Sequence, residues 1–554
     1  MNPIRHAANR TGSQDLALVG FVLTACVAYW AAYDRPTAVV KLLAIVTAAA
    51  IYYVLARTSG PNLWKAAKLC GKACAALAGI TLLTSILDGQ AGAPLAARFG
   101  VVVRGLPVPD LDTEIGLVVV LLPFQVAATV YTWHRGDLVG RMGWLGACLL
   151  VMAVLLVTVS RGAVVAIILS TGAVLWLAHT ATARQPRRLP VLSVSFAGLL
   201  ALGAALAMSG GMANAWAALM DRARLAEEGW WLAQDFLITG GGLGSFPGLY
   251  SRYILLQPFL YFTRSYNLFL DLVIEQGLPA LATYLAIIVG AVWSLAGSRE
   301  LSNAKSWRIR LIRTAAIASL LGVILLGLVH DPFHEPLGAL FLFVGPGFAV
   351  ALRRSPQASP PDLSPGPARN HVPRGPGRLA SPSTVGFLVF ALVMLAGAWP
   401  LSHLPASLWA NVGAVRMAQE ELDGWPGNRA LEPSPEADVA FAQWWLEAAL
   451  ALDPTQRGAN YRMGLLAMKR QDFTEAARYL QTAWEGGQGH RGVGKALGYN
   501  LVWLGQLDRA GEFLEPIPEA AHELSLYAKW WRARGRNDLA AWSEAMSALL
   551  ERAR

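Results

Sequence analysis

The sequence predicts an all-α protein: a polytopic membrane bundle of about eleven spans, N-terminus inside and C-terminus outside, followed by a soluble helical-repeat domain. Three observations predict this class. The chain is 55% hydrophobic and 15% charged, whereas average soluble domains carry about 25% charged residues. Long apolar segments recur from the N-terminus to residue 401. Beyond that point the chain becomes polar, and small residues recur every 34 positions.

Each predicted span is an apolar segment of roughly the 20 residues that a helix needs to cross a bilayer. The segments are 16–33, 36–56, 66–87, 115–133, 143–159, 162–180, 189–208, 268–297, 311–329, 337–352 and 385–401. Residues 1–352 then form the membrane core. The stretch 353–384 is rich in Pro, Ser and Arg, which is typical of a flexible linker, here cytoplasmic.

Basic residues occur in every second loop, which sets the predicted orientation. They stand at the N-terminus, in "RTSGPNLWKAAKLCGK", "HRGDLVGR", "ARQPRRL" and "SRELSNAKSWRIRLIR", and in residues 353–378. Positively charged loops stay in the cytoplasm, so the N-terminus is expected inside and residues 402–554 outside. These loops account for the net charge of +10, so the charge does not indicate a nucleic-acid partner.

Residues 402–554 contain an internal repeat. The residues that share its period of 34 are Ala442, Ala476 and Ala510, then Leu446, Leu480 and Leu514, and also Gly464 and Gly498. This spacing resembles the tetratricopeptide repeat, in which small residues let two helices approach closely and leucines fill the seam. Such a domain implies a protein partner, with a scaffold role as the alternative.

Charged and glycine-rich motifs collect in the predicted outer segments. Arg161 lies between two apolar runs, either as a helix-end arginine that reaches the interface or as a cation that projects into an outward cavity. The long outer loop 209–267 carries Arg222 and Arg224 ahead of a glycine cluster, Gly240 to Gly244. No Lys-Ser/Thr follows these glycines, so they predict tight turns and not a phosphate-binding loop.

The last outer loop, "HDPFHEP", offers titratable groups. His330, Asp331 and His334 suit acid–base chemistry or structural hydrogen bonds. A metal site ranks below both, because prolines interrupt any helix that would pair the histidines. Glu275, in the span 268–297, is expected to be structural, either accepting hydrogen bonds or pairing with an arginine inside the bundle.

The motifs "DFLITGGGLGSF" and "YNLFLDLVIEQGLPALATYLAII" together resemble the O-antigen ligase and polymerase superfamily of bacterial envelope membrane proteins. The matching residues are Arg222, Asp235, Gly240, Gly242, Gly244, Phe246, Asn267, Leu268, Leu270, Glu275, Gly277 and Leu278. "SRG" at 160–162 and Asp331 fall at further family positions. The resemblance covers roughly residues 110–350.

The resemblance implies an inverting glycosyltransferase of the bacterial inner membrane that uses neither metal nor cofactor. Such an enzyme transfers a glycan from an undecaprenyl-diphosphate carrier to a glycan or lipid acceptor at the outer face. Without a metal, arginines must neutralise the diphosphate as it leaves. The expected substrate-binding residues are Arg161, Arg224, Arg264, Asn267, Glu275 and His334, and Arg222 is expected to act in catalysis.

One residue departs from the family pattern, because Tyr266 stands where the family has histidine before Asn267. A phenol is a poor base at neutral pH. The base is then expected from His330, Asp331 or His334, or else arginine electrostatics and an altered acceptor replace it. A ligase, a polymerase and a protein O-oligosaccharyltransferase all fit, and the lost histidine keeps a non-catalytic assembly protein open. A transporter fits less well, because the charges gather at the outer ends of the spans.

Overall fold

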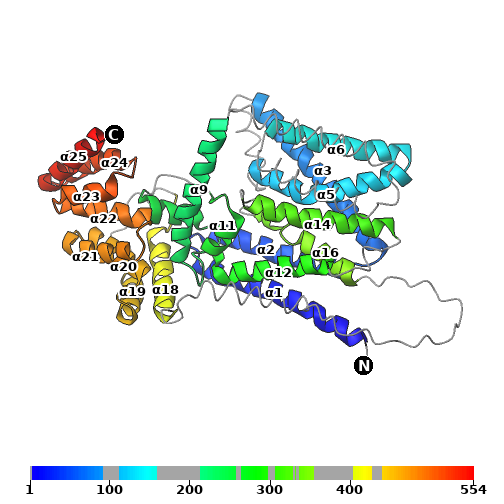
Figure 1. Cartoon of the computed structure of the whole chain (residues 1–554), viewed down its shortest axis with the longest axis horizontal. Helices are drawn as coiled ribbons and strands as arrows, with labels where there is room; N and C mark the ends of the chain where they lie inside the picture. Colours follow the sequence, from blue (N-terminus) through cyan, green and yellow to red (C-terminus); the bar gives the residue numbers. More distant parts are fainter. Residues whose placement is uncertain are drawn as a thin grey trace.

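The computed structural model describes residues 3–90, 111–158, 212–257, 264–296, 306–328, 331, 336–354, 404–426 and 439–553. These residues form helices joined by turns, and no strand occurs among them, as the all-α class requires. Figure 1 shows two parts: a bundle of long helices that lie side by side, and a stack of shorter helices at one end of the bundle.

The bundle is made of long apolar helices. They are α1 (Pro3–Ala31), α2 (Arg35–Arg57), α3 (Pro61–Gln90), α5 (Leu111–Arg135), α6 (Leu138–Thr158), α12 (Leu278–Ala296) and α14 (Trp307–Gly327). Six stretches are long and apolar enough to cross a membrane: Gln14–Ala31, Arg35–Arg57, Pro61–Leu83, Gly116–Arg135, Leu278–Leu295 and Trp307–Gly327. In α6 the apolar stretch Leu138–Val154 is shorter.

Large apolar side chains also face away from the bundle core. Leu16, Leu43, Val54, Leu69 and Leu138 are each at least 60% exposed. Water would disfavour such a surface, whereas the interior of a bilayer favours it. The outward faces of these helices therefore support a multi-pass membrane protein.

Five predicted spans coincide with bundle helices, and 143–159 corresponds to α6. The spans 162–180, 189–208 and 385–401 and the linker 353–384 lie outside the described residues.

Two predicted spans are wrong in detail, because each is broken. The segment 268–297 consists of α11 (Leu268–Gln276) and α12, separated by Gly277. Gly277 has φ +81°, and a Cβ there would lie 2.7 Å from the carbonyl oxygen of Ile238, so the chain turns at this glycine. The segment 337–352 likewise divides into α15 (Pro336–Ala339) and α16 (Val344–Arg354).

The predicted outer loop 209–267 is largely helical. It contains α9 (Met212–Gln234), α10 (Phe246–Tyr250) and a π-helix, η1 (Ser251–Leu255). Helix α9 runs across the end of the bundle, next to the C-terminal helices (Figure 1). The charged residues of α9 interrupt its apolar ones, so the segment lacks the apolar length of a span and was predicted as a loop. In the structure Leu225 and Leu232 of α9 are buried against protein.

The basic helix ends meet at the other end of the bundle. Arg354 of α16 donates a hydrogen bond to the carbonyl oxygen of Ala56 in α2 at 3.3 Å. Arg308 of α14 donates to the hydroxyl of Tyr131 in α5 at 2.8 Å. Among the described residues, these two arginines thus bind neighbouring helices at their basic ends.

The C-terminal part is a series of helical hairpins. Its helices are α18 (Leu404–Glu421), α19 (Ala440–Leu452), α20 (Arg457–Lys469), α21 (Phe473–Glu485), α22 (Arg491–Trp503), α23 (Leu507–Leu514), α24 (Ala520–Ala533) and α25 (Asn537–Arg552). The alanines and leucines of the 34-residue period are buried. A Cβ on Gly464 would lie 2.6 Å from the Cγ atom of Leu480, and one on Gly498 would lie 2.6 Å from the Cγ atom of Leu514. The small residues thus let paired helices approach, as predicted.

Candidate functional site

The segment from Arg264 to Asn267 leads into α11 and fixes how that helix begins. Asn267 is its N-cap: the side-chain oxygen accepts a hydrogen bond from the amide of Leu270 at 3.0 Å. The side-chain nitrogen donates to the carbonyl oxygen of Leu328 at 3.2 Å. Capping satisfies an amide that the first turn would leave open. The side chain of Asn267, predicted to bind substrate, is therefore engaged in holding α11 to the end of α14.

Tyr266 brings two predicted arginines together. Its ring centroid lies 5.5 Å from the guanidinium carbon of Arg222 and 5.9 Å from that of Arg264. Arg264 is 4% exposed, whereas Arg222 on α9 is exposed. Tyr266 has φ +58°, a left-handed conformation that is unfavourable for a bulky residue and is tolerated where the surroundings fix it. The ring of Tyr266 thus lies within cation–π range of both guanidinium groups.

A polar cavity lies beside α11 inside the bundle. Its charged lining consists of Lys41, Asp271, Glu275 and Asp331, among apolar residues such as Phe21 and Leu268. All four charged residues are at most 6% exposed. The cavity has a volume of about 20 Å³, enough for a water molecule. Three carboxyl groups and one ammonium are therefore gathered where a membrane bundle would otherwise exclude charge.

Glu275 is buried and paired, as predicted, but its partner is not an arginine. The Nζ atom of Lys41, on α2, lies 2.6 Å from a carboxylate oxygen of Glu275. Sequence reasoning missed Lys41, although a lone lysine within an apolar span was a signal of a functional or paired charge. The two partners are 234 positions apart in the sequence, so no local pattern could predict that they pair.

The glycine cluster holds the end of α11 in place. The amide of Gly241 donates to the carbonyl oxygen of Ile274 at 2.7 Å, and that of Gly242 donates to that of Glu275 at 3.0 Å. A Cβ on Gly240 would lie 2.1 Å from the Glu275 carbonyl oxygen, and one on Gly242 would lie 2.3 Å from the Ala32 Cα atom. The cluster is thus a tight turn against α1 and α11, as the sequence predicted.

Asp235, directly after the end of α9, faces the C-terminal helices. Its two carboxylate oxygens bind Arg457 at 2.8 Å and Arg462 at 2.9 Å, both on α20. Burial raises the pKa of Asp235, but Arg462 and Arg457 outweigh it and hold the pKa below its usual value. Sequence reasoning gave no indication of this pair, because the arginines follow more than 200 residues later.

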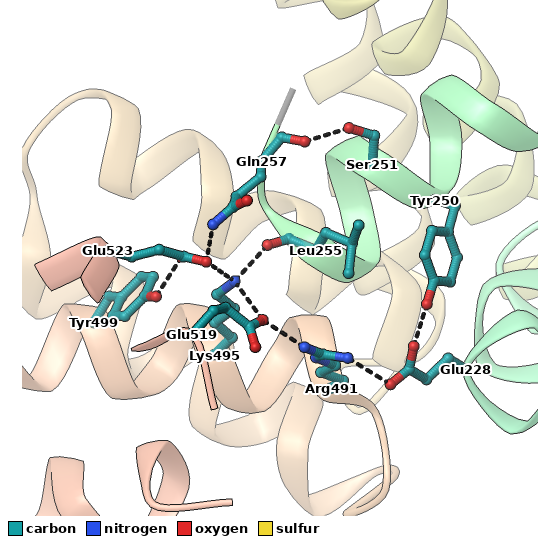
Figure 2. Close-up of polar contacts among 10 residues, drawn as sticks. All are labelled: Glu228, Tyr250, Ser251, Leu255, Gln257, Arg491, Lys495, Tyr499, Glu519 and Glu523. Atoms are coloured by element: carbon teal, nitrogen blue, oxygen red, sulfur yellow. Dashed lines mark hydrogen bonds and ion pairs between the residues drawn. The ribbon is translucent and has the colours of Figure 1, made fainter. Parts of the chain in front are cut away.

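A chain of ion pairs fastens α9 and its neighbours to the same helices (Figure 2). Glu228 of α9 accepts hydrogen bonds from Tyr250 and from Arg491. Arg491 and Lys495, both on α22, bind Glu519 at 2.5 and 3.0 Å. Further contacts join Lys495 to Glu523 and to the carbonyl oxygen of Leu255, and Gln257 and Tyr499 to Glu523. The segment that carries Arg222 is therefore held by the C-terminal helices.

His490 at the start of α22 gives a pH prediction. Its Nδ1 atom accepts the amide of Val493 at 3.1 Å, and the side chain is fully buried. Burial, reinforced by the charge of Arg457, lowers the pKa of His490 to about 3. The unfolded histidine, with a pKa of about 6.5, binds a proton first as the pH falls. Stability is therefore expected to decline from about pH 6.5 towards pH 3.

The measurement is thermal unfolding of the full chain against pH, with His490→Asn as the test variant. Asparagine keeps an acceptor for the cap but does not titrate. The variant should lose part of the acid-side slope. An unchanged slope would show that His490 binds protons equally in the folded and unfolded chain, which would contradict the lowered pKa.

The predicted site residues divide into four groups. Four of them lie on or beside the segment that leads into α11: Arg222, Arg264, Tyr266 and Asn267. Two others, Glu275 and Asp331, line the cavity beside α11. Arg224 is exposed on α9. Arg161, His330 and His334 lie outside the described residues.

Within the described part of the chain, no group of three or more His, Cys, Asp or Glu side chains is arranged to hold a metal ion. Comparison of the chain with family models, with curated proteins and with solved structures finds no match.

Proposed function

We propose that this protein transfers a glycan from an undecaprenyl-diphosphate carrier to an acceptor hydroxyl at the outer face of a bacterial inner membrane. One observation carries the proposal: Arg222 and Arg264 flank Tyr266 immediately before α11, and α11 then lines a cavity with Asp271 and Glu275. Cations just before α11 suit a diphosphate, and the carboxylates of the cavity suit a proton acceptor. On this proposal, the bundle end that carries the C-terminal helices faces outward.

The transfer proceeds by attack of the acceptor oxygen on the anomeric carbon of the lipid-linked glycan. A new C–O bond forms while the bond between that carbon and the diphosphate oxygen breaks, with inversion. The undecaprenyl diphosphate leaves with the electron pair, and the arginines neutralise its charge. Asp331 or His330 takes the proton of the acceptor hydroxyl. Glu275, bound to Lys41, holds the floor of the site.

The same proposal gives the C-terminal helices a tetratricopeptide-like architecture. The close approach of Gly464 to Leu480 and of Gly498 to Leu514, one period apart, supports it. These helices hold α9 and η1 through the contacts of Figure 2, and so position Arg222.

The test is disruption of the gene followed by profiling of lipid-linked glycans and by complementation. Single lipid-linked repeats that accumulate would indicate a polymerase, and long lipid-linked chains without their acceptor would indicate a ligase. Arg222→Ala is expected to lower activity by about 100-fold or more, as the loss of one charge-stabilising group does. Tyr266→Phe, which keeps the ring, should retain most activity, and Tyr266→Ala should not.

Asp331→Asn and His330→Ala identify the base, since loss of the proton acceptor abolishes turnover. Arg478→Ala is the control, because this arginine is exposed on α21. Full complementation by Arg222→Ala, Asp331→Asn and His330→Ala together would exclude the mechanism.

A non-catalytic role in exopolysaccharide assembly is the second candidate. It is favoured by Asp235, whose carboxylate is bound by Arg457 and Arg462 and is directed to the C-terminal helices. In that case the glycan profile changes on disruption, but every site variant restores it.

A further inference from the structure

The hairpin α18–α19 exposes an aromatic surface. Its members, called here the aromatic patch, are Trp409, Phe441, Trp444 and Trp445. Phe441 is 53% and Trp444 is 55% exposed. The rings pack on one another: the Trp409 and Trp445 rings stack with their centroids 4.6 Å apart, and Trp444 meets Trp445 edge-on at the same centroid distance. The patch is thus a pre-formed apolar surface and not a set of scattered side chains.

The internal period shows that this surface is particular to the first hairpin. Thirty-four residues after Phe441 and Trp444 stand Glu475 and Arg478 of α21, and a further period on stand Arg509 and Glu512 of α23. The side chain of Arg478 is 68% exposed. Equivalent outward positions are therefore charged in the later repeats, as water requires, and aromatic in α19.

The patch lies next to the end of a membrane helix. The guanidinium carbon of Arg416 is 5.2 Å from the ring of Trp30 and 5.6 Å from that of Phe441. Gln419 donates to the carbonyl oxygen of Trp30 at 2.7 Å. The apolar stretch of α1 ends at Ala31, one residue further on. Figure 1 shows α18 beside that end of the bundle.

We propose that the aromatic patch rests in the membrane interface and anchors the C-terminal helices to the lipid surface. Tryptophan favours the level of the headgroups, where its ring is apolar and its N–H stays wet. Continuity with Trp30 places the patch at that level, and Arg416 between two rings suits contact with lipid phosphates. The occupant is the bilayer itself, and the anchoring does not depend on glycan transfer.

The experiment uses the full chain in bilayers of phosphatidylethanolamine and phosphatidylglycerol. The four cysteines (Cys26, Cys70, Cys74 and Cys148) are replaced by alanine. A spin label is then placed by Phe441→Cys or Trp444→Cys. Collision with oxygen, which concentrates in lipid, is compared with collision with a water-soluble nickel chelate. The matched control is Trp530→Cys, because Trp530 is 41% exposed on α24, at the far end of the C-terminal part (Figure 1).

The ratio of oxygen to nickel collisions should be several-fold higher at positions 441 and 444 than at position 530. Equal ratios at all three positions would overturn the proposal. Low collision with both reagents at 441 and 444 would indicate burial against protein and would also overturn it.

If the cysteine-free chain does not fold, brominated lipids give a second readout in the natural background. Trp444→Phe should reduce the fluorescence that these lipids quench, and Trp530→Phe should leave it unchanged. Equal quenching in both variants would contradict the anchoring.

Discussion

Replacing Arg462 with methionine is expected to destabilise the C-terminal helices by about 3–5 kcal/mol, the cost of removing one partner of a buried ion pair. Arg462 is fully buried and binds Asp235 at 2.9 Å. Its guanidinium also lies 4.7 Å from the ring centroid of Tyr253. The variant leaves the Asp235 carboxylate buried with Arg457 alone, so α20 should open more readily. Amide hydrogen exchange of α20 and α9 in the full chain measures the change.

The matched control for Arg462 is Arg478→Met. The side chain of Arg478 is 68% exposed, and its guanidinium nitrogen lies 3.9 Å from a carboxylate oxygen of Glu475. Its loss should therefore change stability by no more than about 0.5 kcal/mol. The double variant Asp235→Asn/Arg462→Met should recover part of the lost stability, because it removes the buried carboxylate and leaves only Arg457, whose side chain is 11% exposed, without its ion-pair partner. If Arg462→Met and Arg478→Met behave alike, the C-terminal helices are not held to α9 by this pair.

Replacing Lys41 with methionine should destabilise the bundle by a similar amount, about 3–5 kcal/mol. The ammonium of Lys41 is the charge that faces Asp271, Glu275 and Asp331 across the cavity. Without it, the carboxyl groups of Glu275 and its neighbours must take up protons or admit water. Thermal unfolding of the detergent-solubilised chain should shift to lower temperature, and the proposed glycan transfer should fall as α11 loses its fixed position.

The double variant Lys41→Met/Glu275→Gln tests whether the pair itself is responsible. It should be more stable than Lys41→Met, since the uncompensated carboxylate is gone. Lys65→Met is the control, because Lys65 is exposed near the start of α3. Equal stability of Lys41→Met and Lys65→Met would show that the cavity tolerates its carboxyl groups without the lysine.

Part of the site was readable from the sequence because its signals are local. The apolar segment from residue 268 predicted a helix start there, and the glycines of 240–244 predicted a turn. The prediction of one continuous span over 268–297 failed at Gly277. There, hydropathy continues without interruption, but a positive φ and contact with Ile238 break the helix. Hydropathy indicates whether a segment lies in an apolar environment, but it does not indicate where its helix breaks.

The sequence by itself determined the helical class, the apolar helices of the bundle, and the period of the C-terminal repeat. Those properties follow from composition and from the spacing of neighbours along one helix. The tertiary structure decided which distant charges meet: Lys41 with Glu275, Asp235 with Arg462, and Arg222 with Arg264 around Tyr266. Such pairings depend on where whole helices pack, and a buried charge finds its partner only after the chain between them has folded.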